Sequence, residues 1–144
     1  MLGSKSPRRS ELLKMADLDF EIRTADVEEV YPKDLDQVRI PEYLAALKAE
    51  ALKPGLSKDD MLLTSDTIVL LDGEIFEKPA NEEEAVAMIG RLTGNMHQVI
   101  TGVQLMIGEK KFSFSITTKV WFRELTEDQI RYYVSHYKPL DKAG

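Results

Sequence analysis

The chain has 144 residues, no cysteine and a formal net charge of −6, and its length suits one domain with a sizeable core. The lack of cysteine excludes disulfides, thiolate nucleophiles and zinc-thiolate sites, and it fits a reducing compartment. The acidic balance disfavours nucleic acid polymers and anionic membranes, so the basic residues must act locally, on a small polyanion. The sequence contains no recognisable signal peptide and no apolar run long enough to span a bilayer, and we expect a cytoplasmic protein.

The first feature in chain order is a basic segment, SKSPRR at residues 4–9, which runs directly into a predicted helix over Pro7–Met15. Ser6 is expected to be the N-cap of this helix and Pro7 its first residue. Leu12 then begins an apolar stripe that should face the core.

Three cations of this segment lie where the helix should begin. The N-terminus of a helix carries about half a positive unit charge, so Lys5, Arg8 and Arg9 oppose the helix dipole unless an anion is bound. A phosphate would satisfy these cations and the free N–H donors of the first turn. The alternative is a solvated basic turn, and the serines at Ser4 and Ser6 favour the anion site.

Helix and strand signals alternate along the rest of the chain, which favours an α/β domain. The turn residues glycine, proline and asparagine separate the periodic segments. The expected elements are a short half-exposed strand at 20–24, an acidic turn-rich segment at 26–36, a helix at about 41–55, a strand at Met61–Leu71, a hairpin strand at 74–77, a helix from about 82 to 94, two long strands at 97–107 and 110–122, and a final helix after Thr126.

Two of these helices begin with the pattern of a capping box, Asn81 with Glu84 and Thr126 with Gln129. Apolar residues follow each pair at helical spacing, which indicates one buried face on each helix. The buried stripe of the first of these helices is expected to be Ala85, Met88, Ile89 and Leu92, and the single face of the second to be Ile130, Tyr133, Val134 and Tyr137. The aromatic pair Trp121 and Phe122 is expected in the core or in an interface.

Asp66 is the second strong feature, because it interrupts a strand that is otherwise apolar or hydroxylic. An ionised carboxylate is costly there unless something pairs with it. It is either a strand-end aspartate bonded to a turn, or a metal ligand or general base. A two-residue turn at Asp72-Gly73 pairs Thr67 with Lys78, but strict alternation turns Lys78 to the face opposite Asp66. A shared site therefore needs a bulge or a break in the ladder.

Other charged residues leave alternatives open. Glu28 and Glu29 could hold a hard cation together with the strand aspartate, or could belong to a solvated acidic loop. Lys48 could reach a phosphate or simply lie along the surface. His97 and His136 have no partner at metal-ligand spacing, and we interpret both as structural.

Several common catalytic motifs are absent from the sequence. It has no Walker loop, no Gly-x-Gly-x-x-Gly after a strand, no Gly-x-Ser-x-Gly elbow and no His-Glu-x-x-His. A basic phosphate site and a carboxylate centre remain. This pairing suits metal-assisted attack of water on a phosphorus atom.

These residues resemble one known family, the Maf nucleotide pyrophosphatases, first named as septum formation inhibitors. The resemblance implies an α/β fold in which a mixed twisted sheet with flanking helices forms two lobes around a cleft, often as a homodimer. The matching blocks run from end to end of the chain and comprise residues 4–9 with 11–13, 65–67 with Val69, 77–79, 92–94 with His97, Val99, Thr101 and Gly102, and 140–144.

The family's activity implies cleavage between the α and β phosphates of a nucleoside triphosphate, giving the monophosphate and pyrophosphate with a divalent cation, Mg²⁺ or Mn²⁺. By position in the motifs, the resemblance implies roles for individual residues. Asp66 corresponds to the catalytic proton acceptor and a metal ligand, Glu29 to a metal partner, Ser4, Ser6, Arg9, Lys48 and Lys78 to phosphate contacts, and Arg8 and Thr67 to determinants of substrate specificity.

Arg8 and Thr67 resemble the branch of the family that acts on dTTP and UTP rather than the branch that acts on 7-methyl-GTP. Against the family pattern, we expect residues 1–144 to form a single Maf-like domain truncated at both ends, without a later glutamine that contributes to substrate choice. The alternative function is a nucleotide-binding regulatory protein that acts on septum formation through a partner, with little turnover. A buried catalytic carboxylate would distinguish the enzyme from a pure binder.

Overall fold

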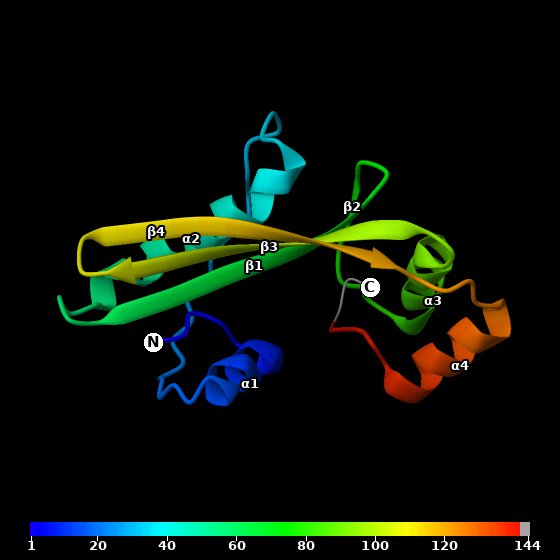
Figure 1. Cartoon of the computed structure of the whole chain (residues 1–144), viewed down its shortest axis with the longest axis horizontal. Helices are drawn as coiled ribbons and strands as arrows, with labels where there is room; N and C mark the ends of the chain where they lie inside the picture. Colours follow the sequence, from blue (N-terminus) through cyan, green and yellow to red (C-terminus); the bar gives the residue numbers. More distant parts are fainter. Residues whose placement is uncertain (142–144) are drawn as a thin grey trace. The chain divides into compact units, whose positions relative to one another are not determined.

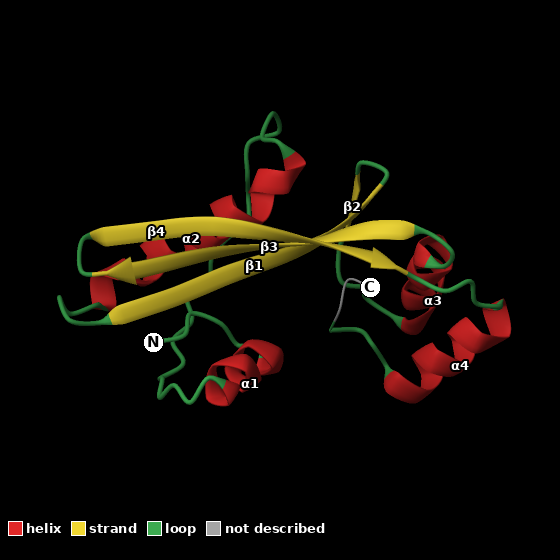
Figure 2. Ribbon diagram, in the orientation of Figure 1, coloured by secondary structure: helices red, strands yellow, loops and turns green. Residues whose placement is uncertain are grey.

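The computed structural model describes residues 1–141 as an α/β protein (Figure 1). Helices and strands alternate as the sequence pattern predicts, and loops join them (Figure 2). No helix within residues 1–141 combines the length and the apolar character that a membrane crossing requires. The elements are α1 Pro7–Met15, η1 Gln37–Arg39, α2 Ile40–Leu52, η2 Lys53–Gly55, β1 Met61–Leu71, β2 Glu74–Phe76, α3 Glu82–Leu92, β3 Met96–Ile107, β4 Lys110–Trp121 and α4 Glu127–Tyr137.

The named strands form a four-stranded sheet in the order β2-β1-β3-β4, with neighbouring strands antiparallel (Figure 1). The hairpin has the predicted register, because Leu71 pairs with Glu74 and Val69 with Phe76. The expected mixed sheet is corrected on one point: the parallel pairing is limited to isolated bridges from Leu2 to Ile22 and to Leu63. The two-residue turns at both hairpins impose antiparallel pairing on the strands that they join.

The chain divides into two compact units, and the strands β1, β3 and β4 contribute residues to both. The first unit comprises Met1–Thr67 and Thr101–Ile116, and the second comprises Ile68–Ile100 with the chain from residue 117. The expected cleft stays a prediction. The first unit has a core of Ala49, Leu62 and Met106, and the second has two apolar clusters, one around Val69, Leu71, Phe76, Met88 and Leu92, the other around Ala85, Ile89, Ile130 and Val134.

Within the first unit, α2 lies unusually close to the sheet. A Cβ atom added at Gly102 of β3 would lie 2.1 Å from the backbone nitrogen of Glu42, at the start of α2. The buried hydroxyl of Thr64 on β1 donates a hydrogen bond of 2.6 Å to the carbonyl of Ala45, in the middle of α2. The close approach at Gly102 and the hydrogen bond from Thr64 to Ala45 therefore fix where α2 lies against β3 and β1.

The N-terminal segment differs from expectation in three ways. Helix α1 has the predicted bounds and Ser6 at the N-cap position, but the Ser6 side chain does not cap it. The helix buries no residue and Leu12 is exposed, so the predicted apolar stripe is wrong. The strand expected at 20–24 is reduced to a bridge at Ile22. The stripe failed because α1 is held at its first turn by polar contacts, described below, rather than by an apolar face.

The later helices follow the sequence pattern more closely. Thr126 and Gln129 form the complete capping box of α4, whereas at α3 the Asn81 side chain caps Glu84 N–H but Glu84 bonds to Ala80 N–H instead of returning to the N-cap backbone. The four predicted core residues of α3 are all buried. Tyr133 and Tyr137 are exposed, so their predicted burial is wrong, and Trp121 is exposed, so of its two predicted places only an interface stays a prediction. Phe122 packs against the core as predicted.

Candidate active site

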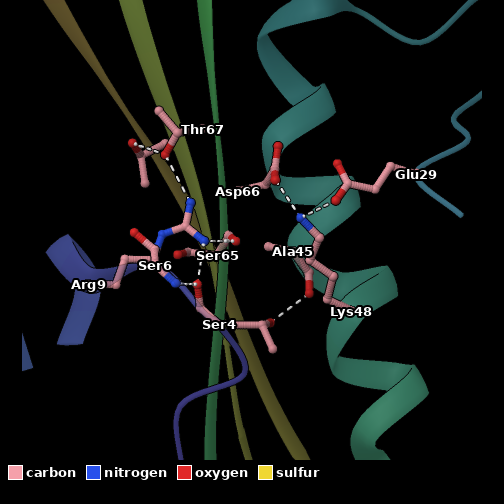
Figure 3. Close-up of polar contacts among 11 residues, drawn as sticks. Ser4, Ser6, Arg9, Glu29, Ala45, Lys48, Ser65, Asp66 and Thr67 are labelled. Atoms are coloured by element: carbon pink, nitrogen blue, oxygen red, sulfur yellow. Dashed lines mark hydrogen bonds and ion pairs between the residues drawn. The ribbon is translucent and has the colours of Figure 1, made fainter. Parts of the chain in front are cut away.

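Three charged side chains meet on one side of β1, and we call Glu29, Lys48 and Asp66 the carboxylate cluster (Figure 3). The Lys48 ammonium donates to Asp66 Oδ1 at 2.6 Å and pairs with Glu29 Oε1 at 2.9 Å. The side chains of Asp66 and Lys48 are only 13% and 20% exposed, whereas that of Glu29 is 52% exposed. Asp66 is therefore paired with a cation, as an ionised carboxylate in this strand requires, and its role as metal ligand or general base stays a prediction.

The position of Lys48 follows from the packing of α2. Lys48 lies one helical turn after Ala45, whose carbonyl accepts the Thr64 hydroxyl, and Asp66 lies two residues after Thr64 on the same face of β1. The Thr64 bond therefore sets the register between α2 and β1 that brings Lys48 against Asp66. Glu29 comes from the irregular acidic segment before η1.

Burial raises the pKa of the Asp66 carboxyl above its ordinary value, and the hydrogen bond and charge of Lys48 oppose that rise. Glu29 adds to the rise as a like charge, and Arg9 acts against it. A carboxylate whose pKa is raised is a stronger base than an exposed one. Its second oxygen, Oδ2, accepts no hydrogen bond from the described residues, so Asp66 retains an oxygen that can accept a proton from water.

The second cluster surrounds the guanidinium of Arg9, and we call Ser4, Arg9, Ser65 and Thr67 the arginine cluster (Figure 3). Arg9 Nη1 donates to Ser4 Oγ at 3.1 Å and to the Ser65 carbonyl at 2.8 Å, and Nη2 donates to Thr67 Oγ1 at 3.4 Å. Burial lowers the Arg9 pKa, although Asp66 acts in the opposite direction. Three acceptors from two segments, the N-terminal segment and β1, thus fix one cation in a defined orientation.

The predicted phosphate contacts of the first helix divide into buried and exposed residues. Ser4 is buried, and its oxygen accepts from both Ser6 N–H, at 3.2 Å, and Arg9. The side chain that accepts a backbone N–H just before α1 is therefore that of Ser4, and not that of the predicted N-cap Ser6. Arg8 is exposed and Ser6 partly buried, and their proposed contacts with a nucleotide stay predictions.

The two clusters lie on opposite sides of β1, because Asp66 and Thr67 are consecutive in a strand (Figure 3). The ladder with β2 stops at Val69, and the bridge to Leu2 lies at Leu63. In the described residues, β1 therefore has no strand partner at Asp66 and Thr67 on the side away from β3. A ligand that lies across this free edge can reach both clusters.

Two sequence predictions are not resolved by these contacts. Lys78 is exposed, between β2 and α3 in the second unit, and its role stays a prediction. His97 is buried, with no hydrogen-bond partner for Nδ1 among the described residues, and it packs edge-on against Phe122. These contacts agree with the structural interpretation of His97. Of the motif block 140–144, residues 142–144 lie outside the described residues.

The structure also gives contacts to three residues that the sequence analysis assigned no role. Thr64 positions Lys48, the Ser65 carbonyl binds Arg9, and Thr101 on β3 lies 3.0 Å from Thr67, oxygen to oxygen. The hydroxylic run of β1 could have pointed to the first two. Thr101 belongs to a matching family block, but its contact with Thr67 was not predicted, because only the pairing of β3 beside β1 brings the two residues together.

The site contains two carboxylates that share one lysine, with an oriented arginine beside them. Such a site suits a phosphate-bearing ligand, and the fold that carries it is α/β. The Maf-like protein family matches the chain over residues 1–144. The chain belongs to the Maf family.

Similar proteins agree with this assignment. The chain is 48% identical over 145 residues to a dTTP/UTP pyrophosphatase of Parabacteroides distasonis, covering all of this chain and 75% of that protein. It is 46% identical over 144 residues to a dTTP/UTP pyrophosphatase of Cytophaga hutchinsonii, covering all of this chain and 66% of the relative. A third protein of that name, from Bacteroides thetaiotaomicron, is 46% identical over 145 residues, with 100% and 75% covered.

Proposed function

We propose that this protein is a nucleoside triphosphate pyrophosphatase that hydrolyses dTTP and UTP to the monophosphate and pyrophosphate. The observation that carries the proposal is Asp66, a carboxylate that is 13% exposed and is bonded to Lys48 through one oxygen, while its other oxygen accepts no hydrogen bond from residues 1–141. The Arg9 guanidinium lies across the strand from it. Similarity over all of residues 1–144 to relatives named dTTP/UTP pyrophosphatase supports the choice of substrate.

The reaction that these residues suit is the attack of water on the α-phosphorus. Asp66 accepts a proton from the water while the oxygen of that water forms the new bond to the α-phosphorus. The bond from the α-phosphorus to the α–β bridging oxygen breaks. The electron pair leaves with pyrophosphate. Arg9 and Lys48 are the cations that bind and orient the phosphates, and the negative charge that develops on the leaving group requires such donors.

A divalent cation fits the carboxylate cluster. Asp66 and Glu29 direct one oxygen each at the same ammonium, that of Lys48, so their oxygens already converge on a positive charge. Carboxylate oxygens suit Mg²⁺ or Mn²⁺, and residues 1–141 hold no group of three or more acidic, histidine or cysteine side chains that could enclose a metal unaided. Phosphate oxygens and water would complete the coordination. Such a cation would neutralise charge on the phosphates and polarise the phosphorus.

We further propose that the protein acts in the cytoplasm, that residues 1–144 act as one Maf-like domain, and that the protein can form a homodimer. Arg8, Thr67, Ser6 and Lys78 complete the proposed site as substrate contacts. The roles of these four residues rest on their resemblance to the motifs of the family, whose model matches residues 1–144.

The direct test is pyrophosphate release by the wild-type protein and by Asp66→Asn, with dTTP, UTP and 7-methyl-GTP as substrates and Mg²⁺ or Mn²⁺ present. The substitution removes a base and a charge but little volume. We expect the rate to fall at least about a hundredfold, with the affinity for a non-hydrolysable dTTP analogue changed only a few-fold. Asp59→Asn, at an exposed aspartate of the first unit, is the matched control.

Turnover near the wild-type rate in Asp66→Asn would refute the role of Asp66. Binding of dTTP without measurable turnover by the wild type would favour the regulatory alternative. A higher kcat/KM for 7-methyl-GTP than for dTTP and UTP would refute the substrate assignment, because a site that pairs its polar groups with one base leaves them unmatched by another.

A further inference from the structure

Thr101 of β3 contacts the site but has no role in the function proposed above. Its Oγ1 lies 3.0 Å from Thr67 Oγ1 on the neighbouring strand β1, and either hydroxyl can be the donor. Thr67 Oγ1 also accepts from Arg9 Nη2 at 3.4 Å. Thr101 is partly buried, whereas Thr67 is exposed. The partly buried Thr101 hydroxyl is therefore linked to Arg9 through the exposed hydroxyl of Thr67.

The hydrogen-bond capacity of these groups indicates what they leave available. A guanidinium has five N–H donors, and three of those of Arg9 are directed at Ser4, the Ser65 carbonyl and Thr67. A hydroxyl oxygen accepts two hydrogen bonds and donates one. If Thr67 accepts from both Arg9 and Thr101, its own hydrogen has no acceptor in the arginine cluster and is free for a ligand that presents an oxygen.

We propose that Thr101 is a positioning residue of the phosphate site: it donates to Thr67, so that the Thr67 hydroxyl hydrogen and the remaining N–H donors of Arg9 are presented together to one phosphate oxygen. The proposal rests on the proposed function for the phosphate nature of the ligand. A bound anion favours this arrangement, because a donor that is polarised by two incoming hydrogen bonds binds an anionic oxygen more strongly.

The experiment measures the binding of inorganic tripolyphosphate by isothermal titration calorimetry, so that its result does not depend on turnover. The variants are Thr101→Val, which keeps the shape and removes the hydroxyl, Thr101→Ser, which keeps the hydroxyl, Thr67→Val, and the double variant Thr67→Val/Thr101→Val. Thr118→Val, at an exposed threonine of β4, is the matched control. Circular dichroism and urea unfolding of each variant report whether the fold is kept.

We expect Thr101→Val to weaken tripolyphosphate binding about three- to tenfold, the scale of one neutral hydrogen bond. Thr101→Ser should restore affinity to within about twofold, and the control should match the wild type. The double variant should bind no more weakly than Thr67→Val, because Thr101 acts only through Thr67.

Three results would overturn the proposal: wild-type affinity in Thr101→Val, losses that simply add in the double variant, or no detectable binding of tripolyphosphate by the wild type. A parallel assay of dTTP hydrolysis by the wild type separates this proposal from the proposed function. Lack of hydrolysis together with the expected tripolyphosphate series would refute the enzymatic assignment and leave the role of Thr101 supported.

Discussion

Replacement of Lys48 by glutamine tests how the carboxylate cluster controls Asp66. Lys48 Nζ lies 2.6 Å from Asp66 Oδ1, and both side chains are mostly buried, so solvent screens this pair little. The contact with the half-exposed Glu29, at 2.9 Å, is screened more and is given less weight. Burial and the nearby Glu29 charge raise the pKa of Asp66, and Lys48 lowers it. Without the ammonium, the pKa of Asp66 should therefore rise further.

The magnitude follows from the hydrogen bond that is lost. A hydrogen bond to a charged group contributes about 1.5–3 kcal/mol, which at about 1.4 kcal/mol per factor of ten corresponds to a roughly ten- to hundredfold loss in ionisation of Asp66. The acidic limb of the pH profile of kcat/KM should therefore move towards neutral pH in Lys48→Gln. A lost phosphate contact alone would lower kcat/KM by the same factor at every pH. In Lys48→Gln, kcat/KM should fall by a larger factor at acidic pH than at neutral pH.

Two measurements check this reasoning. The pH profile of kcat/KM reports the limb, and ¹³C NMR of the aspartate carboxyls follows the ionisation of Asp66 in the free protein, without substrate. Lys53→Gln is the matched control, because Lys53 pairs at 3.3 Å with Glu109, which is 90% exposed. The reasoning is refuted if the Asp66 titration stays in place, or moves to lower pH, in Lys48→Gln, or if the Lys53 variant moves it equally.

Arg9→Ala should weaken triphosphate binding about ten- to hundredfold and hardly change nucleoside binding, because the lost contact is charge-assisted; equal losses for both ligands in calorimetry would contradict the phosphate role. Burial lowers the His97 pKa, so the unfolded chain binds the proton more readily, and stability should fall as the pH drops below about 6.5. Urea unfolding at pH 7.5 and 5 should show a smaller fall in His97→Phe than in the wild type. Gly102→Ala should destabilise the fold by about 2 kcal/mol or more, because its Cβ would overlap the Glu42 backbone, whereas Gly90→Ala, in open space on α3, should not.

The sequence alone determined the elements wherever the periodicity was strong and the turn chemistry specific. The strand Met61–Leu71 and its register with the next strand follow from the Asp72-Gly73 turn, and the buried face of α3 follows from its apolar spacing. Local rules suffice in these cases, because the turn and the period each fix the geometry of their own neighbours. Sequence also identified Asp66, since a carboxylate in an apolar strand requires a partner.

Only the tertiary structure decided which partner Asp66 has and how the cations divide. Lys48 was ambiguous between a phosphate contact and a surface residue, until the Thr64 bond to α2 placed it 2.6 Å from Asp66. The pairing of β3 beside β1 likewise brought Thr101 to Thr67, and polar contacts to Arg9 rather than an apolar stripe held α1. Such contacts join residues far apart in the chain, so they depend on how whole elements pack, and no local pattern encodes that packing.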